Sequence, residues 1–192
     1  MSVKKMAFIA MAASLFFVST GSAAENLGMT PERMAGLISE YLGHQDGAEA
    51  GGRIELLGPQ YEKDKFKIGV LSCKDILFTG TVEESTGYMK DVSIFMLILD
   101  DDDAERFLNT GLILGRLVPP FCRVWALSDD NFSEMIKMYE EAVDAAGKEG
   151  RFSRKTVLAE NDRPIYYKVF AVFGDRGVVV RSTVSAEEIP DS

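Results

Sequence analysis

The sequence has few histidines and cysteines, two residue types that often carry catalysis or bind metals. Its 192 residues include one histidine, His44, and two cysteines, Cys73 and Cys122, which do not form a CxxC pair. Any Ser-His-Asp or Cys-His machinery would have to use His44, which lies in the glycine-rich stretch 43–52. A flexible loop is a poor platform for a general base, and one histidine with two separated cysteines matches no known zinc-ligand spacing. We therefore interpret His44 as an exposed loop residue.

Nucleotide-binding signatures are also absent. The chain contains no GxxxxGK[ST] loop, and no GxGxxG follows a strand-like run. Such loops bring backbone N–H groups close to phosphates, so nothing in the sequence supports a nucleotide site. We predict no cofactor.

Basic side chains are outnumbered by acidic ones, 21 to 30, which gives a net charge of -9. Such a surface repels phosphate backbones and anionic lipid headgroups, which disfavours nucleic-acid and membrane-surface roles. It is typical of a well-solvated protein and leaves a basic protein partner open.

The longest apolar run lies at the N-terminus. Two lysines precede the run Met6–Val18, and small residues follow as far as Ala24. This order is typical of a secretory signal peptide cut after Ala24, and the run is too short to span a bilayer comfortably. No cysteine lies near the cut, which disfavours a lipid anchor. We predict a signal peptide at residues 1–24 and a single exported domain at residues 25–192, periplasmic or extracellular, with no membrane anchor after cleavage.

In an oxidising compartment, two cysteines suggest one disulfide. A bridge between Cys73 and Cys122 would close a loop of about 50 residues, worth about 4 kcal/mol in the chain-entropy model. The alternative is two separately buried thiols. We predict the disulfide.

Helical and strand periodicities follow one another along the rest of the chain. The predicted helices run from Pro31 to about Leu42, from the run Asp100–Asp103 to Pro119 and Pro120, and from Asp129 or Asp130 to Gly147. The predicted strands are Arg53–Leu57, Lys65–Leu71, Ile76–Val82, Asp91–Leu99, Arg123–Leu127, Phe152–Leu158, Ile165–Phe173 and Val178–Val184. Because Asp91–Leu99 is apolar on both faces, we expect it at the centre of the sheet with both faces covered.

Grouped strands with helices between the groups predict an α+β fold: a single domain with a mainly antiparallel sheet and about three helices packed on it. The alternative is a mixed α/β sheet that contains one βαβ unit, built from Asp91–Leu99, the helix after it and Arg123–Leu127.

Gly111 and Gly115 form a GxxxG pattern within the second helix. Each glycine costs a helix about 1 kcal/mol relative to alanine, so another element should approach the backbone closely there. We expect that element to be the central strand.

The run Asp100–Asp103 is a dense cluster of carboxylates between a strand and a helix. Carboxylates in such a place suit Ca²⁺ or Mg²⁺, with Asp100, Asp101 and Asp103 as candidate ligands. The spacing does not match an EF-hand, because no glycine stands at the sixth position and Glu105 comes too early for the twelfth. Aspartates at a helix start also accept from free backbone N–H groups and oppose the helix dipole, which is the interpretation we favour.

Tyr166, Lys168 and Phe170 share one face of the predicted strand Ile165–Phe173. Two aromatic side chains around a lysine suit a protein-binding surface. The same pattern is typical of a strand that is covered by helix on one face and partly solvated on the other.

These observations favour an exported, non-catalytic protein that binds another macromolecule, as a periplasmic accessory factor, an inhibitor or a subunit. A basic protein partner would be attracted by the net charge. The alternative hypothesis is a small divalent-cation-dependent enzyme or ligand-binding protein that uses Asp100–Asp103.

Overall fold

The computed structural model describes residues 26–43, 53–98, 104–159, 164–174 and 177–190. The described residues form a single α+β domain with three helices and a seven-stranded antiparallel sheet, which confirms the predicted fold class. The helices are α2 (Pro31–Gly43), α3 (Ala104–Trp125) and α4 (Asp129–Glu149). The strands are β1 (Gln60–Glu62), β2 (Lys65–Val70), β3 (Cys73–Val82), β4 (Met89–Ile98), β5 (Arg151–Ala159), β6 (Ile165–Gly174) and β7 (Gly177–Ser185).

The strands lie in the order β1-β2-β3-β4-β7-β6-β5, and each neighbouring pair is antiparallel. The strand predicted to be central, β4, is the fourth of the seven. It joins the meander β1–β4 to the meander β5–β7, and Ile94 lies opposite Ser182 in the pairing with β7. The alternative fold with a βαβ unit is wrong, because the strand after the helices that pairs with β4 is the antiparallel β7.

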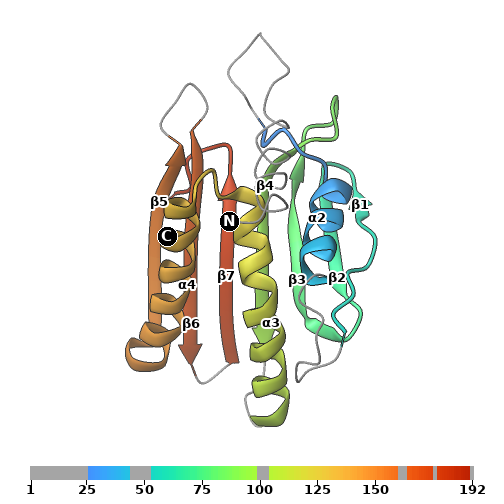
Figure 1. The fold of residues 1–192 in the computed structure, drawn as a ribbon. Coiled ribbons are helices and arrows are strands. Elements are labelled where there is room, and N and C mark those ends of the chain that lie inside the picture. Colours follow the sequence, from blue (N-terminus) through green and yellow to red (C-terminus); the bar gives the residue numbers. More distant parts are fainter. Residues whose placement is uncertain (1–25, 44–52, 99–103, 160–163, 175–176, 191–192) are drawn as a thin grey trace, which may run out of the picture.

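All three helices lie on one face of the sheet (Figure 1). Helix α3 packs on β3 and β4, α4 packs on β5 and β6, and α2 packs beside α3. The core lies between these layers, where Phe78 of β3 meets Phe121 of α3 with ring centroids 6.1 Å apart. Alternate residues of each strand point into this core, so the face opposite the helices carries the other half of the strand side chains.

Helix α3 continues through Pro119 and Pro120 to Trp125, so the strand predicted at Arg123–Leu127 is wrong. Each proline inside a helix removes a backbone hydrogen bond at about 3 kcal/mol. The helix gains by burying the side chains around and after them, since full burial of one large apolar side chain contributes about 1.5–3 kcal/mol. The buried side chains of this half of α3 are Leu117, Val118, Pro120, Phe121, Cys122 and Trp125.

The helix starts follow the expected capping chemistry, with one change of residue. Thr30 Oγ1 accepts a hydrogen bond from the backbone N–H of Arg33 at 3.3 Å, at the start of α2. At the start of α4 the capping oxygen belongs to Ser128, whose Oγ accepts from the N–H of Asn131 at 3.1 Å. The predicted cap, Asp129 or Asp130, lies in the first turn, where an acidic side chain opposes the helix dipole.

The glycine that permits a close backbone approach is Gly80 in β3. A Cβ placed there would lie 2.1 Å from the carbonyl oxygen of Asp91 and 2.8 Å from Cε1 of Phe66. A Cβ placed on Gly111 or Gly115 would meet no atom within 4 Å beyond its own helix surroundings. The expectation that these two helical glycines pack on the central strand is therefore wrong.

The segment predicted as a strand at residues 53–57 is not one. It forms an isolated bridge between Leu56 and Val70, and the N–H of Leu57 donates to the carbonyl of Gly69 at 2.9 Å. The segment therefore runs beside the end of β2 without a regular ladder.

Candidate functional site

We call the face of the sheet opposite the helices the open face. Along β4, alternate side chains from Val92 to Ile98 are buried beneath the helices, whereas Phe95 and Leu97 lie on the open face. Phe95 is half-buried and Leu97 is 36% exposed. Within the described part of the chain no helix covers this face (Figure 1). The expectation that both faces of the central strand are covered is therefore wrong for the open face.

Phe95 and Leu97 belong to a continuous group of apolar residues. Leu77 of β3 lies opposite Phe95, Val179 of β7 lies opposite Leu97, and Val172 of β6 lies opposite Val179. We call these five residues the apolar patch. Single apolar residues are ordinary on a surface, but a contiguous group across four strands is typical of an interaction site.

Basic residues lie on the same face as the apolar patch. Strand alternation places six basic residues on the open face: Lys65, Lys67, Arg151, Lys155, Lys168 and Arg181. Among the described strand residues on the open face, the carboxylates at paired positions include Glu62 and Asp91. Much of the acidic excess lies instead on α4, whose acidic residues are Asp129, Asp130, Glu134, Glu140, Glu141, Asp144 and Glu149. The paired strand positions of the open face thus carry a net positive charge, opposite in sign to the net charge of the whole chain.

Arg181 lies between the apolar patch and a row of hydroxyl groups. Its Nε and Nη2 donate to Ser93 Oγ at 3.0 and 2.9 Å, and Ser93 Oγ lies 2.9 Å from Thr183 Oγ1. Ser93 and Thr183 are buried. These contacts tie the guanidinium to both β4 and β7, so a positive charge is held in place at the centre of the open face.

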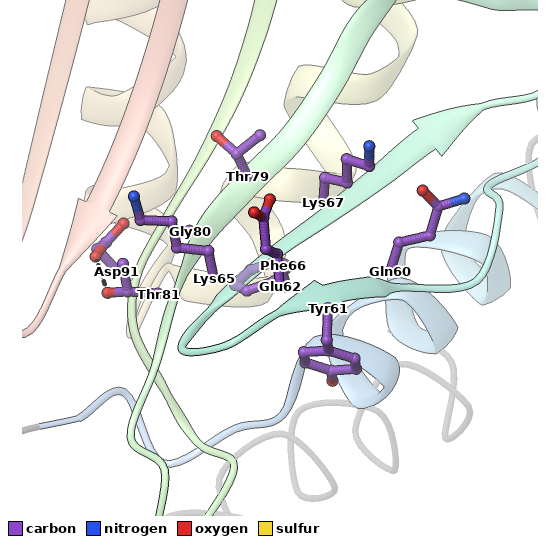
Figure 2. A pocket seen from close by; sticks show the side chains of 10 residues that line it. All are labelled: Gln60, Tyr61, Glu62, Lys65, Phe66, Lys67, Thr79, Gly80, Thr81 and Asp91. Carbon is purple, nitrogen blue, oxygen red and sulfur yellow. Dashed lines mark hydrogen bonds between the residues drawn. The ribbon is translucent and has the colours of Figure 1, made fainter.

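A shallow groove of about 590 Å³ lies on the open face beside β1 (Figure 2). Figure 2 shows Glu62, Lys67 and Thr79 pointing to the same side, whereas Tyr61 points the other way, toward α2. The Tyr61 hydroxyl donates there to Glu32 Oε1 at 2.5 Å. The groove is lined by Gln60, Tyr61, Glu62, Lys65, Phe66, Lys67, Thr79, Gly80, Thr81 and Asp91.

Asp91 is the partly buried carboxylate of this groove. Burial raises its pKa above the ordinary value, against the hydrogen bond from Thr81 and the charge of Arg181, which both lower it. Thr81 Oγ1 donates to Asp91 Oδ2. Because the pKa is raised, Asp91 takes up its proton at a higher pH than an exposed aspartate. The net charge of the groove therefore becomes more positive as the pH falls through the raised pKa of Asp91.

The three predicted surface residues of β6 all lie on the open face. Phe170 is half-buried, and the guanidinium carbon of Arg151 lies 5.6 Å from the centre of its ring. Tyr166 is half-buried opposite Ser185. Lys168 is 7% exposed, and its Nζ donates to the carbonyl of Pro190 at 2.7 Å. The structure thus brings the three together on one face but covers the lysine with the segment that follows β7.

The two cysteines are separate buried thiols in the structure, not the predicted disulfide. Cys73 Sγ lies 3.6 Å from Thr110 Oγ1. Cys122 follows Thr110 by twelve residues on the same helix, which is about 18 Å along its axis. A disulfide requires Cα atoms within about 7 Å of each other. Burial raises the pKa of the Cys122 thiol to about 12, against a lowering contact with the Tyr167 hydroxyl.

Several sequence candidates lie outside the described residues. They are Asp100, Asp101, Asp103, His44 and the predicted signal peptide at residues 1–24. Among the residues that the structure does describe, no group of three or more His, Cys, Asp or Glu is arranged to hold a metal ion. The described helices also include none that is long and apolar enough to cross a membrane.

Sequence reasoning missed the cationic character of the open face. The alternation of Lys65 and Lys67 with buried residues marks one side of β2 as basic, and this signal is visible in the sequence. The placement of Arg151, Lys155 and Arg181 on one face with Lys65 and Lys67 depends on strand register, which the sequence alone does not supply.

Comparison of the chain with protein-family models, with curated proteins and with solved structures found no match.

Proposed function

We propose that this is an exported, non-catalytic protein that binds another protein through the open face of its sheet. The observation that carries the proposal is the central strand β4, which has apolar side chains on both faces but helices on one. A strand of this composition is ordinarily covered on both sides. The apolar patch on the open face is therefore interpreted as the centre of a docking surface.

The size of the open face suits this role. Six strand spacings of about 4.8 Å make the sheet about 29 Å wide, and its ten-residue strands are about 33 Å long. The projected area of about 900 Å² is close to the roughly 800 Å² that each partner contributes to a standard interface. A group of apolar residues with charged residues beside it is also common in such interfaces.

The charge of the open face indicates which partner it fits. Its basic residues share the face with the apolar patch, and Ser93 holds Arg181 beside the patch. Opposite charges across an interface speed association and select partners. We propose a partner that presents an apolar surface bordered by carboxylates. This replaces the basic partner suggested by the net charge, because local charge governs docking at short range.

The test is a capture experiment with two matched variants. Leu97→Glu places a carboxylate in the apolar patch, and Leu112→Glu makes the same change on α3, where Leu112 is 57% exposed. Purified wild-type and variant proteins are cross-linked in an envelope extract of the native host at low and moderate salt. Captured proteins are then quantified by mass spectrometry.

We expect a partner that is retained by the wild type and by Leu112→Glu and is reduced at least about tenfold by Leu97→Glu. A tenfold loss corresponds to about 1.4 kcal/mol of binding free energy. Thermal unfolding of both variants establishes that the change acts on binding. Equal capture by Leu97→Glu and wild type, or no retained partner at either salt concentration, would exclude docking on this face.

A further inference from the structure

The segment after β7 folds over one corner of the open face. We call residues Ala186–Pro190 the strap. The N–H of Ala186 donates to the carbonyl of Lys90 at 2.9 Å, which fixes the beginning of the strap beside β4. Glu188 Oε1 lies 3.2 Å from Lys155 Nζ, and the carbonyl of Pro190 accepts from Lys168 Nζ at 2.7 Å. The strap therefore crosses the strands β5 and β6 with its oxygen atoms directed at two lysines.

These two lysines lie directly opposite each other. Register pairs Lys155 of β5 with Lys168 of β6, and both belong to the open face. Like charges in directly opposed positions destabilise a sheet, and a lysine that is only 7% exposed requires polar partners for its ammonium group. Glu188 supplies a carboxylate to this pair, and Pro190 supplies a carbonyl. The strap thus has the contacts of a bound acidic peptide.

We infer that Lys155 and Lys168 form the anion-binding subsite of the docking surface, and that an acidic, extended segment of the partner takes the place of the strap there. This inference rests on the proposed function, since it names the chemistry by which the partner is recognised. The strap shows which chemistry the subsite accepts: a carboxylate and a backbone carbonyl, carried by an extended chain. Tyr166 and Phe170 flank the subsite on β6 and provide contact area for apolar residues of the same segment.

The strap is also a competitor of that partner. A segment tethered directly to β7 has an effective local concentration of the order of millimolar, so an external segment must either bind more tightly or make further contacts. The apolar patch offers such contacts, because it lies on the same face, whereas the strap contacts Lys90, Lys155 and Lys168. Binding at the patch and release of the strap are therefore expected together.

The experiment measures how readily Lys168 is acetylated by an N-hydroxysuccinimide ester, by mass spectrometry of the purified protein. Glu188→Lys replaces the attraction to Lys155 by repulsion, and Glu187→Lys makes the same charge change on the neighbouring exposed residue. We expect the rate at Lys168 to rise at least about tenfold in Glu188→Lys and to stay near the wild-type rate in Glu187→Lys. Glu188→Gln, which removes the charge without reversing it, should give a smaller rise in the same direction.

A synthetic peptide of residues 185–192 (SAEEIPDS) then serves as the probe in trans. At millimolar concentration it should restore the protection of Lys168 in Glu188→Lys, and the same peptide with glutamine in place of Glu188 should not. The subsite is refuted if Lys168 is acetylated at the wild-type rate in Glu188→Lys, or if the peptide does not slow the acetylation of Lys168 in that variant. Loss of capture by Leu97→Glu together with this negative result would overturn the subsite alone and leave the docking face standing.

Discussion

The substitution of Gly80 by alanine tests the pairing that places the apolar patch on the open face. Its Cβ would lie 2.1 Å from the carbonyl oxygen of Asp91, about 0.9 Å closer than the 3.0 Å below which real Cβ contacts are essentially never found. The obstructing atom belongs to the backbone of β4, and Phe66, which lies 2.8 Å away, is itself buried. The strands β3 and β4 therefore have to separate locally to accept the methyl group.

Overpacking a well-filled site costs about 1–3 kcal/mol, and a clash with backbone on one side belongs at or above the upper end of that range. We expect Gly80→Ala to lower the free energy of unfolding by at least about 3 kcal/mol. For a chain of this size that corresponds to a fall in Tm of about 6–12 °C. The assay is thermal and urea unfolding, followed by far-ultraviolet circular dichroism.

Gly111→Ala is the matched control, because a Cβ there meets nothing within 4 Å beyond its own helix surroundings. Alanine is favoured over glycine in a helix by about 1 kcal/mol, so we expect a stabilisation of up to that size and a rise in Tm of about 2–4 °C. If Gly80→Ala unfolds within about 1 kcal/mol of the wild type, or if Gly111→Ala is destabilising, the β3–β4 geometry or the solvent-facing placement of Gly111 is wrong.

Two further predictions concern titratable groups. The raised pKa of Asp91 means that its ionised form is disfavoured in the folded state. Its contribution to the free energy of unfolding therefore falls as the pH rises from the pKa of the unfolded state through the pKa of the folded state. Above the folded-state pKa the contribution stays low. Asp91→Asn should therefore raise Tm at pH 7 and leave it unchanged below pH 3, and a lower Tm at pH 7 would contradict the assigned burial. The buried thiols Cys73 and Cys122 should react with Ellman's reagent only after unfolding, and dithiothreitol should leave Tm unchanged. A fall in Tm of several degrees on reduction would instead indicate the disulfide.

Much of the fold could be predicted from the sequence, because local patterns determine most of its elements. The helix starting at Pro31 and the strands of the last third of the chain are marked by periodicity and by turn residues at their ends. The central place of β4 follows from its two apolar faces. These signals are local, so they survive without knowledge of the tertiary structure.

The failures all depend on distant contacts. Pro119 and Pro120 predict a helix end, but the burial of Phe121 and Trp125 in the tertiary core outweighs the lost hydrogen bonds. The predicted disulfide failed for a related reason, since the extended α3 carries Cys122 far from Cys73. The sequence around Pro119 and Pro120 shows neither which distant residues bury Phe121 and Trp125 nor how far α3 extends.

The candidate site could be predicted in part. Strand alternation placed Tyr166, Lys168 and Phe170 on one face, and the structure has them there. The opposition of Lys155 and Lys168 depends on strand register. The position of the strap depends on contacts with residues distant in the chain, such as Lys168. Net charge suggests a basic partner, whereas the charge of the open face leads to the proposal of an acidic one, because net charge averages α4 with the sheet.

The pairing of β4 with β7 also determines the order in which the domain can be completed. Ser93 and Thr183, which meet at the middle of the sheet, are 90 positions apart in the chain, and the length-dependent entropy of closing such a loop is about 4 kcal/mol. Before β7 is synthesised, the strands β1–β4 form a half-sheet in which β4 is an edge strand. Its ten residues are rich in apolar side chains, and their backbone groups can pair with strands of other molecules. A chain truncated before residue 177 is therefore expected to aggregate, because it lacks β7, the strand that pairs with β4 in the full-length protein.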